Sequence, residues 1–240
     1  MENFKLTVIV PVYNEAENLH RVANEFEAYL RIASVSIKVL FVNDGSNDNS
    51  LDIIKSICAQ NEAFQYINFN KNYGLSAAIK AGFDYSKSEL TGYIDADLQT
   101  HPEDFELLLE HIGDYDLVTG NRARNRKDKF IKNMSSRIAN SIRRAFTNDG
   151  MDDTGCPLKI IKTSYAQKIP MFRGLHRFLP AMILLQNGKV KQVDVRHFPR
   201  IAGTTKFGLS NRILGPLADC FAFIWMKKKY INYSVESKSC

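Results

Sequence analysis

The sequence predicts an α/β fold in which a mainly parallel central sheet is flanked by helices. In the first half of the chain, short apolar runs alternate with segments that carry apolar residues at helical spacing. The apolar runs are nearly continuous, which is typical of strands buried on both faces of a parallel sheet. The predicted strands cover residues 6–13, 37–44, 66–70, 90–97 and 116–121, and the predicted helices cover 15–31, 48–60 and 74–87, with another opening at Pro102.

Residue type and spacing justify each of these elements. The predicted strands are rich in Val, Ile, Leu, Phe and Tyr, and Asn, Asp, Gly and Ser bound several of them, as expected at turns. The helices between them are about 12–17 residues long, which suits crossovers that return the chain to the start of the next parallel strand.

The second half is less regular. The expected elements are a basic helix at 128–147, a loop at 148–157, a strand at 158–162, a helix at about 176–186, a strand at 189–198, a loop at 199–208 and a final amphipathic helix. No linker separates the two halves, so the sequence favours one domain.

Charge is unevenly distributed along the 240 residues. The net charge is +6, and residues 121–144 contain many Lys and Arg but a single acid, Asp128. Residues 187–229 are basic again, which favours an anionic partner such as a nucleic acid, a phosphorylated molecule or an anionic membrane. The basic segment lacks interleaved aromatic residues and any nucleic-acid-binding module, so nucleic acid is the least favoured of these partners.

The cysteine spacing and the hydropathy of the chain predict where in the cell the protein is found. Cys58, Cys156, Cys220 and Cys240 are scattered and predict reduced thiols rather than disulfides or a metal site. We expect no signal peptide and no membrane span, because no run approaches the ~18–20 apolar residues that a span needs. Residues 213–226 could lie on a membrane. The expected location is cytoplasmic, either free or peripheral on the inner face of the cell membrane.

Three polar clusters follow predicted strands. They are PVYNE after the first strand, NDGS after the second and DAD at the end of the fourth. Right-handed crossovers place the carboxyl ends of parallel strands at one edge, where ligands bind in open α/β sheets. As an alternative, Asn14, Ser46 and Asp48 could simply cap helices. That explains each residue alone but not three clusters at successive strand ends.

Asp95 and Asp97 predict a metal site. If the strand continues through them, residues two apart share one face, and both carboxylates can reach a single ion. Paired carboxylates with few other ligands suit Mg²⁺ or Mn²⁺ bound together with substrate phosphates. Gln99 is a candidate third oxygen ligand, whereas His101 fits local structure better. The sequence contains no P-loop and no GxGxxG motif, so a diphosphate other than that of ATP is indicated.

These motifs resemble family 2 glycosyltransferases, in particular the branch containing dolichyl-phosphate mannose synthases and bacterial undecaprenyl-phosphate glycosyltransferases. The resemblance rests on an ordered series that covers nearly the whole chain to about residue 225: PVYNE (11–15), NDGSNDNS (43–50), NKNYGLSAAIKAGF (70–83), DADLQ (95–99), GNR (120–122), DTGCPLKIIK (153–162), FRGLHRFLPAMILLQNG (172–188) and HFPRIAGTTKFG (197–208).

The resemblance implies a GT-A fold, which is a Rossmann-like sheet with a C-terminal acceptor-side extension. It divides a single domain at 1–225 into a nucleotide-sugar-binding half (1–122) and an acceptor-side half (123–225), followed by a basic and polar tail (226–240). It also implies inverting transfer of a sugar from a UDP- or GDP-linked donor.

The resemblance assigns roles by motif position. The base and ribose of the donor would be held by Pro11, Tyr13, Glu15 and Asp44, and the donor would also contact Asp95, Ala96 and Asp97. Mg²⁺ or Mn²⁺ would be held by Asp95, Asp97 and Gln99. Donor or acceptor phosphates would be faced by Arg122, Arg177, Arg200 and Lys206, and the catalytic residues would be Asp95, Asp97 and Arg200.

Two acceptors remain open. A polyprenyl phosphate is already ionised near pH 7 and needs no general base, which fits a chain with no evident base–nucleophile pair. A sugar hydroxyl would need a carboxylate such as Asp152 or Asp153 to accept its proton. The partners expected are therefore a nucleotide-sugar donor, a polyprenyl-phosphate acceptor and a membrane surface or membrane partner. A homo-oligomer is compatible with the sequence.

Several positions depart from the family pattern. Asn43 replaces a frequent Asp, Cys156 stands where some relatives have an acid, and Lys159 stands where Arg is frequent. Cys156 at that position argues against a catalytic base in the loop.

Overall fold

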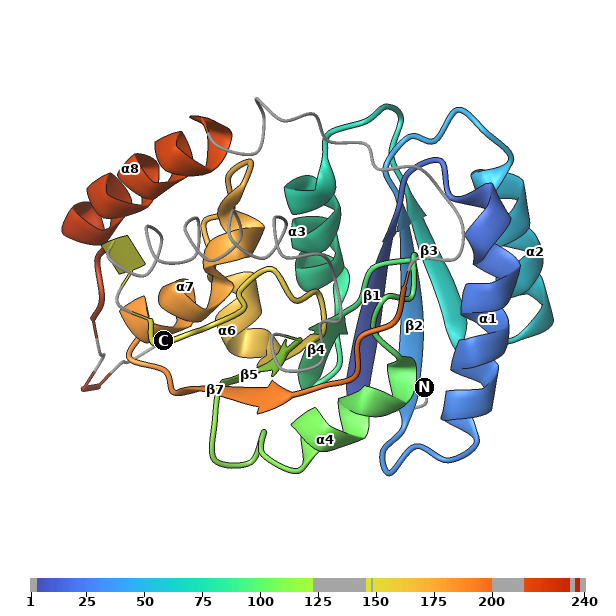
Figure 1. Ribbon diagram of the computed structural model, residues 1–240, viewed down its shortest axis with the longest axis horizontal. Coiled ribbons are helices and arrows are strands. Elements are labelled where there is room, and N and C mark those ends of the chain that lie inside the picture. Colours follow the sequence, from blue (N-terminus) through green and yellow to red (C-terminus); the bar gives the residue numbers. More distant parts are fainter. Residues whose placement is uncertain (1–3, 123–145, 148, 200–213, 234–235, 238–240) are drawn as a thin grey trace.

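A computed structural model describes residues 4–122, 146–147, 149–199, 214–233 and 236–237. A central sheet lies between two layers of helices, with α1 and α2 on the right of Figure 1 and α3, α6, α7 and α8 on the left. The bounds of the strands are β1 Leu6–Val12, β2 Ile37–Asn43, β3 Phe64–Asn68, β4 Leu90–Tyr93, β5 Leu117–Asn121, β6 Lys159–Lys162 and β7 Val190–Asp194. The expected α/β architecture with a mainly parallel sheet is confirmed.

The seven-stranded sheet has the order β3-β2-β1-β4-β6-β5-β7. All strands except β6 run in one direction, and β6 is antiparallel to both of its neighbours, β4 and β5. The sequence predicts a strand at 158–162 but not its direction. A strand buried on both faces reads as an apolar run whichever way it points, because each of its faces packs on a helical layer.

The helices are α1 Ala16–Leu30, α2 Ser50–Gln60, α3 Leu75–Tyr85, α4 Phe105–Leu109, α6 Thr163–Gln167, α7 Leu179–Leu185 and α8 Leu214–Lys229, with 3₁₀ turns η1 Pro102–Asp104 and η2 Leu175–Phe178. The predicted helix at about 176–186 is therefore η2 followed by α7, and α6 was not predicted. The predicted basic helix at 128–147 lies outside the described residues except for its last two. Within the described part of the chain, no helix combines the length and apolarity needed to cross a membrane.

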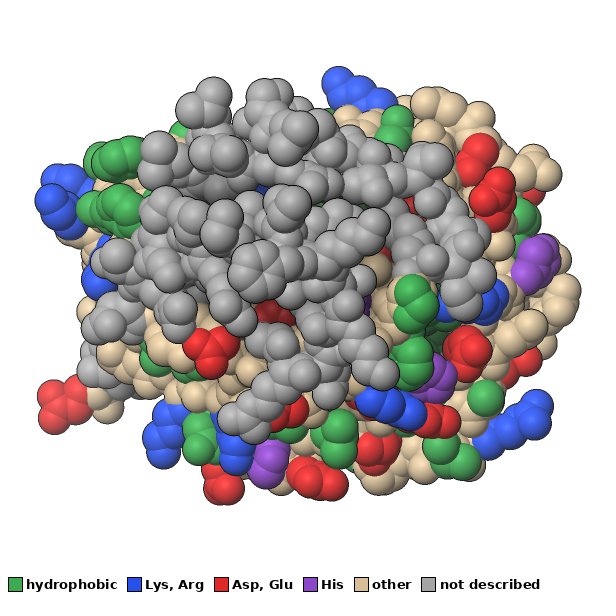
Figure 2. Space-filling model, viewed as in Figure 1, with side chains coloured by type: hydrophobic (Ala, Val, Ile, Leu, Met, Phe, Trp, Pro, Cys, Tyr) green, Lys and Arg blue, Asp and Glu red, His purple; other side chains and the backbone are tan. Residues whose placement is uncertain are grey.

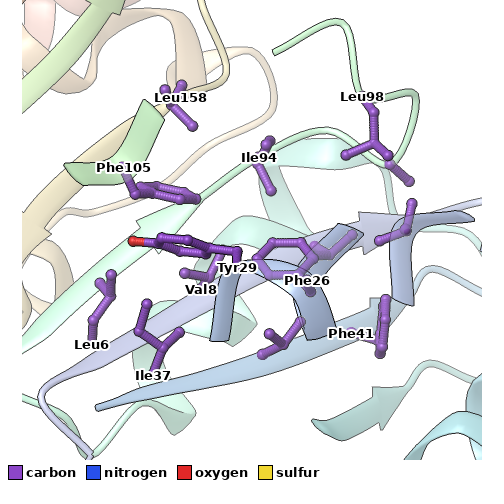
Figure 3. Packing of buried hydrophobic residues seen from close by; sticks show 14 of the residues in the cluster. Leu6, Val8, Phe26, Tyr29, Ile37, Phe41, Ile94, Leu98, Phe105 and Leu158 are labelled. Carbon is purple, nitrogen blue, oxygen red and sulfur yellow. The ribbon is translucent and has the colours of Figure 1, made fainter. Parts of the chain in front are cut away.

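Two cores lie on opposite faces of the sheet because successive strand side chains alternate. Leu6 and Val8 of β1 pack with α1, α2 and α4, whereas Ile9 packs with α3, α6 and α7. Figure 3 shows the first core, where the rings of Tyr29 and Phe105 stack with centroids 6.4 Å apart. The Tyr29 hydroxyl donates to Glu106 at 2.7 Å, and burial together with this partner raises the pKa of Tyr29. These cores fix the strand ends that carry the polar clusters.

Two strands end four residues earlier than predicted: the strand expected at 189–198 is β7, which ends at Asp194, and β4 ends before the DAD motif. The run 90–97 was expected to be strand throughout, but β4 ends at Tyr93 and the DAD motif lies in a turn. The Ile94 amide still donates to the carbonyl of Ile9 at 3.1 Å, and the chain then turns at Leu98, whose φ is +50°. Polar residues that bond their own backbone compete with strand pairing, which explains the early end.

Candidate active site

The carboxyl ends of β1, β2 and β4 meet at one edge of the sheet. Val12 of β1 pairs with Asn43 of β2, and Ile9 pairs with Tyr93 of β4. Pro11, Tyr13 and Glu15 are half-buried at this edge. The predicted convergence of the three polar clusters is therefore present in the fold.

The loops after β1 and β2 are hydrogen-bonded to one another. The Ser46 hydroxyl accepts from the Asn14 amide at 2.9 Å and lies 2.6 Å from Asn43 Oδ1. Asn14 Oδ1 accepts from the Asn47 amide at 2.8 Å, with Asn14 at a φ of +51°. Asn14 and Ser46 therefore brace the two loops rather than only capping helices.

Asp48 binds the first backbone amides of two helices, α1 and α2. Its carboxylate accepts from the Ser50 amide at 3.0 Å and from the Ala16 amide at 3.1 Å, which joins α2 to the start of α1. Burial acts to raise the pKa of Asp48, but these hydrogen bonds outweigh it and lower the pKa. The helix-cap alternative is therefore correct in part for this residue.

Asp44 organises the loop that precedes α3. Its buried carboxylate accepts from the amides of Tyr73 at 2.7 Å and Gly74 at 2.8 Å, and from the side chain of Asn72 at 3.0 Å. A pocket of about 400 Å³ opens beside this loop. Its lining carries five Asn amides and one cation, from Asn43, Asn47, Asn68, Asn70, Asn72 and Lys71. This amide lining can donate to and accept from a polar ring.

The DAD motif forms a tight turn. The Leu98 amide donates to the Asp95 carbonyl at 3.3 Å, and the Gln99 amide donates to Asp97 Oδ1 at 3.1 Å. Asp97 is 8% exposed, Asp95 is partly exposed, and Ala96 is buried between them. The two carboxylates are thus placed by a turn, not by the shared face of a strand.

The ligand types at this turn fit a hard divalent cation. Asp95, Asp97 and Gln99 offer oxygen atoms, as Mg²⁺ and Mn²⁺ prefer. In the residues that the structure describes, no group of three or more His, Cys, Asp or Glu is placed to hold a metal by itself. A metal at this turn would therefore be completed by water and donor phosphates.

Arg122 lies in a buried ion pair with Asp153. The Arg122 backbone amide, Nε and Nη2 contact the two carboxylate oxygens at 3.2, 2.9 and 3.1 Å. Burial acts to lower the pKa of Arg122, but Asp153 and the nearby charge of Asp95 raise it. The role of Arg122 at a phosphate stays a prediction, and Asp153 is already engaged as a partner for this cation.

Lys159 lies beneath the same site. It is fully buried on β6, its Nζ donates to the carbonyls of Thr154 (3.3 Å) and Cys156, and it lies 5.2 Å from the Tyr93 ring centroid. Burial lowers the pKa of Lys159 to about 8. This cation holds the loop at 153–157 against the end of β4.

A backbone contact joins the second half of the chain to the DAD turn. The Phe198 amide donates to the Gln99 carbonyl at 2.9 Å. Arg196, two residues earlier, bonds the carboxylate of Asp104 through its backbone amide and its Nε. The predicted roles of Arg200 and Lys206 concern residues outside those described.

Arg177 connects η2 to α8. Its Nη1 lies 3.2 Å from Asp219 Oδ2, so its predicted phosphate contact stays a prediction. Next to it, His176 Nδ1 lies 2.8 Å from the Ser76 hydroxyl, which also accepts from the Gly174 amide at 2.9 Å. Burial and the charge of Arg177 lower the pKa of His176 to about 3, so the ring is neutral near pH 7.

Sequence reasoning missed the partners that hold the site residues. These are Asn72, Tyr73 and Gly74 around Asp44, and Lys159 below the site. The available signal for Lys159 was its place beside the apolar pair of the short strand KIIK, because a charge is rarely buried without partners. His101 has a structural role, as the sequence suggests. Its Nε2 lies 3.0 Å from a carboxylate oxygen of Glu25, and its Nδ1 accepts from the Glu103 amide at 3.3 Å.

Comparison with known sequences identifies relatives. The chain is 27% identical over 237 residues to dodecaprenyl-phosphate galacturonate synthase of Rhizobium johnstonii, covering 95% of this chain and 70% of the relative. It is 30% identical over 210 residues to undecaprenyl-phosphate 4-deoxy-4-formamido-L-arabinose transferase of Aeromonas hydrophila, covering 87% and 64%. The chain thus spans about two thirds of the length of these curated relatives.

Solved structures share the fold. Glucosyl-3-phosphoglycerate synthase from Mycobacterium tuberculosis in complex with phosphoglyceric acid superposes with a TM-score of 0.70 at 12% identity, covering 95% of this chain and 81% of that chain. A mannosyltransferase from Pyrobaculum calidifontis in complex with GDP-Man and Mn²⁺ gives 0.67 at 16%, covering 93% and 64%. The model of the family described as glycosyl transferase family 2 matches residues 7–169, which span β1 to the end of α6. With the motif order, the sheet topology and this match in agreement, the chain belongs to glycosyl transferase family 2.

Proposed function

We propose that this chain transfers a sugar from a nucleotide-sugar donor to a polyprenyl phosphate, at the inner face of the cell membrane. An acceptor phosphate oxygen attacks the anomeric carbon, and the bond from that carbon to the donor diphosphate breaks. The nucleoside diphosphate leaves with the electron pair, and the configuration at carbon inverts. Both curated relatives named above carry a polyprenyl phosphate in their names.

The observation that carries the proposal is the convergence of the Asp44 loop, the DAD turn and the Arg122 ion pair at one edge. The Asn-lined pocket beside Asp44 suits a nucleobase, since amides can donate and accept in its plane. Asp95 and Asp97 suit the diphosphate end, where a bound Mg²⁺ or Mn²⁺ would neutralise the charge on the leaving group. The base and the diphosphate would thus be held by separate loops.

The environment of Asp153 favours an acceptor that needs no base. Its carboxylate takes three hydrogen bonds from Arg122, so protonating it during catalysis would break a buried ion pair. A phosphate acceptor is ionised before it binds and loses no proton in the step. Asp152 is exposed and remains the candidate base if the acceptor is instead a sugar hydroxyl.

Thermal unfolding tests the donor half of the proposal. We expect one of UDP-Glc, UDP-GlcNAc, UDP-Gal and GDP-Man to raise Tm only when Mg²⁺ or Mn²⁺ is present. A donor at 100 times its Kd stabilises by about 2.7 kcal/mol, which corresponds to roughly 5–10 °C for a chain of this size. Asp97→Asn should abolish the metal-dependent part. If no donor shifts Tm in a metal-dependent way, the proposal fails.

Radiolabel transfer tests the acceptor half. Undecaprenyl phosphate and undecaprenol, which lacks the phosphate, form a matched pair of acceptors. Transfer to the phosphate alone, unaffected by Asp152→Asn, is the expected result. Transfer to undecaprenol or to a soluble glycan that Asp152→Asn abolishes would establish the hydroxyl reaction instead.

A further inference from the structure

Helix α8 has an inner face that belongs to the core. Cys220 and Phe223 are 3% and 1% exposed, and the Phe223 ring stacks on Phe178 with centroids 5.4 Å apart. Asp219 is held by Arg177 of η2. These contacts fix the rotation of α8 about its axis, so the identity of its outward residues is determined.

The outer face of α8 is apolar. Phe221 is 59% exposed, with one edge against Phe146, and Trp225 is 67% exposed. Positions three and four apart share a helix face, so these rings lie on one stripe with the exposed Ala218 and Ala222. Beyond the helix, Ile231 and Tyr233 are 81% and 80% exposed.

This exposure is concentrated in one place. Of the six most exposed large apolar side chains in the described part of the chain, four lie between residues 221 and 233. Single exposed apolar residues are common, whereas a cluster indicates a surface that another body covers. Figure 2 shows apolar and basic side chains next to each other at the left-hand end, where α8 lies in Figure 1.

Charge identifies the covering body. Lys227, Lys228 and Lys229 form the last turn of α8 and are exposed. The only acid in residues 214–233 is Asp219, which is turned inward to Arg177. A second copy of this chain, with a net charge of +6, would bring lysine against lysine. A tryptophan followed by lysines instead suits the surface of a bilayer. The aromatic ring can lie at the boundary between headgroups and acyl chains, and the lysine ammonium groups can lie among anionic headgroups.

We propose that the outer face of α8, extended by Ile231 and Tyr233, lies in the interfacial layer of an anionic lipid membrane. This inference rests on the membrane location in the proposed function and deepens it, and its own evidence is the exposed side chains and the charge of α8. Docking would also bring the site edge close to the lipid. Asp219 of α8 pairs with Arg177 of η2, and the backbone amide of Gly174, just before η2, donates to the Ser76 hydroxyl in the first turn of α3. Because α3 follows β3, its first turn lies at the carboxyl edge of the sheet, so these contacts connect α8 to that edge.

The chain offers an internal probe, since Trp225 is its only tryptophan. The 240-residue chain is titrated at 0.15 M salt with vesicles of phosphatidylcholine alone or with 30% phosphatidylglycerol. We expect a blue shift of Trp225 emission and co-sedimentation only with the anionic vesicles. Replacing the three lysines by glutamine should weaken binding by roughly a hundredfold, and F221S should also weaken it. Y85S, at another exposed aromatic, is the matched control and should bind normally.

Three outcomes would overturn the proposal. They are no blue shift with anionic vesicles, binding that the lysine and F221S variants leave unchanged, and a concentration-dependent dimer that F221S dissolves, which would assign the face to a second copy. Circular dichroism shows whether each variant is folded. Donor-dependent Tm shifts, measured without vesicles, report on the proposed transfer separately, so either proposal can fail alone.

Discussion

Replacing Asp153 by alanine is expected to destabilise the protein more than any surface substitution. The change removes the acceptor of three hydrogen bonds from Arg122 and leaves a buried guanidinium without its counterion. Asp153 is the main group that raises the pKa of Arg122 against the effect of burial, but a guanidinium keeps its proton near pH 7 even without that partner, so the group stays charged. Removing one partner of a buried pair costs about 3–5 kcal/mol, a large share of the about 5–15 kcal/mol that stabilises a typical domain.

A double-mutant cycle isolates this interaction. Replacing both partners by apolar residues, Arg122→Met with Asp153→Leu, removes both charges together. The remaining cost is that of the Arg122 backbone amide, which loses its acceptor, about 1–3 kcal/mol. The double variant should therefore lose less stability than Asp153→Leu alone, and far less than the sum of the losses of Arg122→Met and Asp153→Leu.

Urea unfolding followed by circular dichroism measures each variant. Asp52→Ala, which breaks an exposed 4.0 Å pair with Lys55 on α2, is the control and should change stability by less than about 1 kcal/mol. Losses in the double variant that equal the sum of the single losses would refute the reasoning. They would mean that Arg122 and Asp153 do not interact in the folded state.

Three further expectations concern stability. Burial lowers the pKa of Lys159 to about 8 in the folded state, against 10.5 for an exposed lysine, so the unfolded chain binds more protons between these pH values. The free energy of unfolding should therefore rise by about 3 kcal/mol from pH 8 to 10.5, relative to that of Lys159→Met. If the free energy of unfolding had the same pH dependence in both proteins, this expectation would be wrong. Gly45→Ala should lower Tm and donor affinity, because Gly45 has a φ of +64° and its Cβ would press on the Lys71 backbone; unchanged donor titrations would count against it. Phe223→Ala should cost about 3–5 kcal/mol in urea unfolding through its lost stack on Phe178; a loss below about 1 kcal/mol would mean that α8 is not docked.

The strands of the sheet could be predicted because apolar runs indicate buried strands and turn residues indicate where those strands end. Strands at 6–13 and 37–44 correspond to β1 and β2 to within one residue at each end. The polar strand ends were predicted for the same reason. Burial does not encode strand direction, so the antiparallel β6 could not be read from LKIIK. Nor does it encode the turn at Leu98, which depends on backbone hydrogen bonds that form only around the two aspartates.

The basic residues illustrate a second limit of prediction. Arg122 and Arg177 were assigned to phosphates by motif position, yet each contacts an acid distant in sequence, Asp153 or Asp219. Ion pairs between segments 31 or 42 residues apart depend on tertiary placement, which no local pattern contains. Lys159, the first residue of β6, is a further example, because its buried charge is tolerated through the carbonyls of Thr154 and Cys156, which lie outside the strand.

The position of β6 determines how this protein can be divided. It lies between β4 and β5, and it comes from a part of the chain that follows both. A fragment ending at residue 122 would leave the facing edges of β4 and β5 without hydrogen-bonding partners, and exposed edges of this kind promote aggregation. Residues 1–122 are therefore not a separable unit. Any shortened form that keeps the edge formed by the ends of β1, β2 and β4 must retain the chain through Lys162.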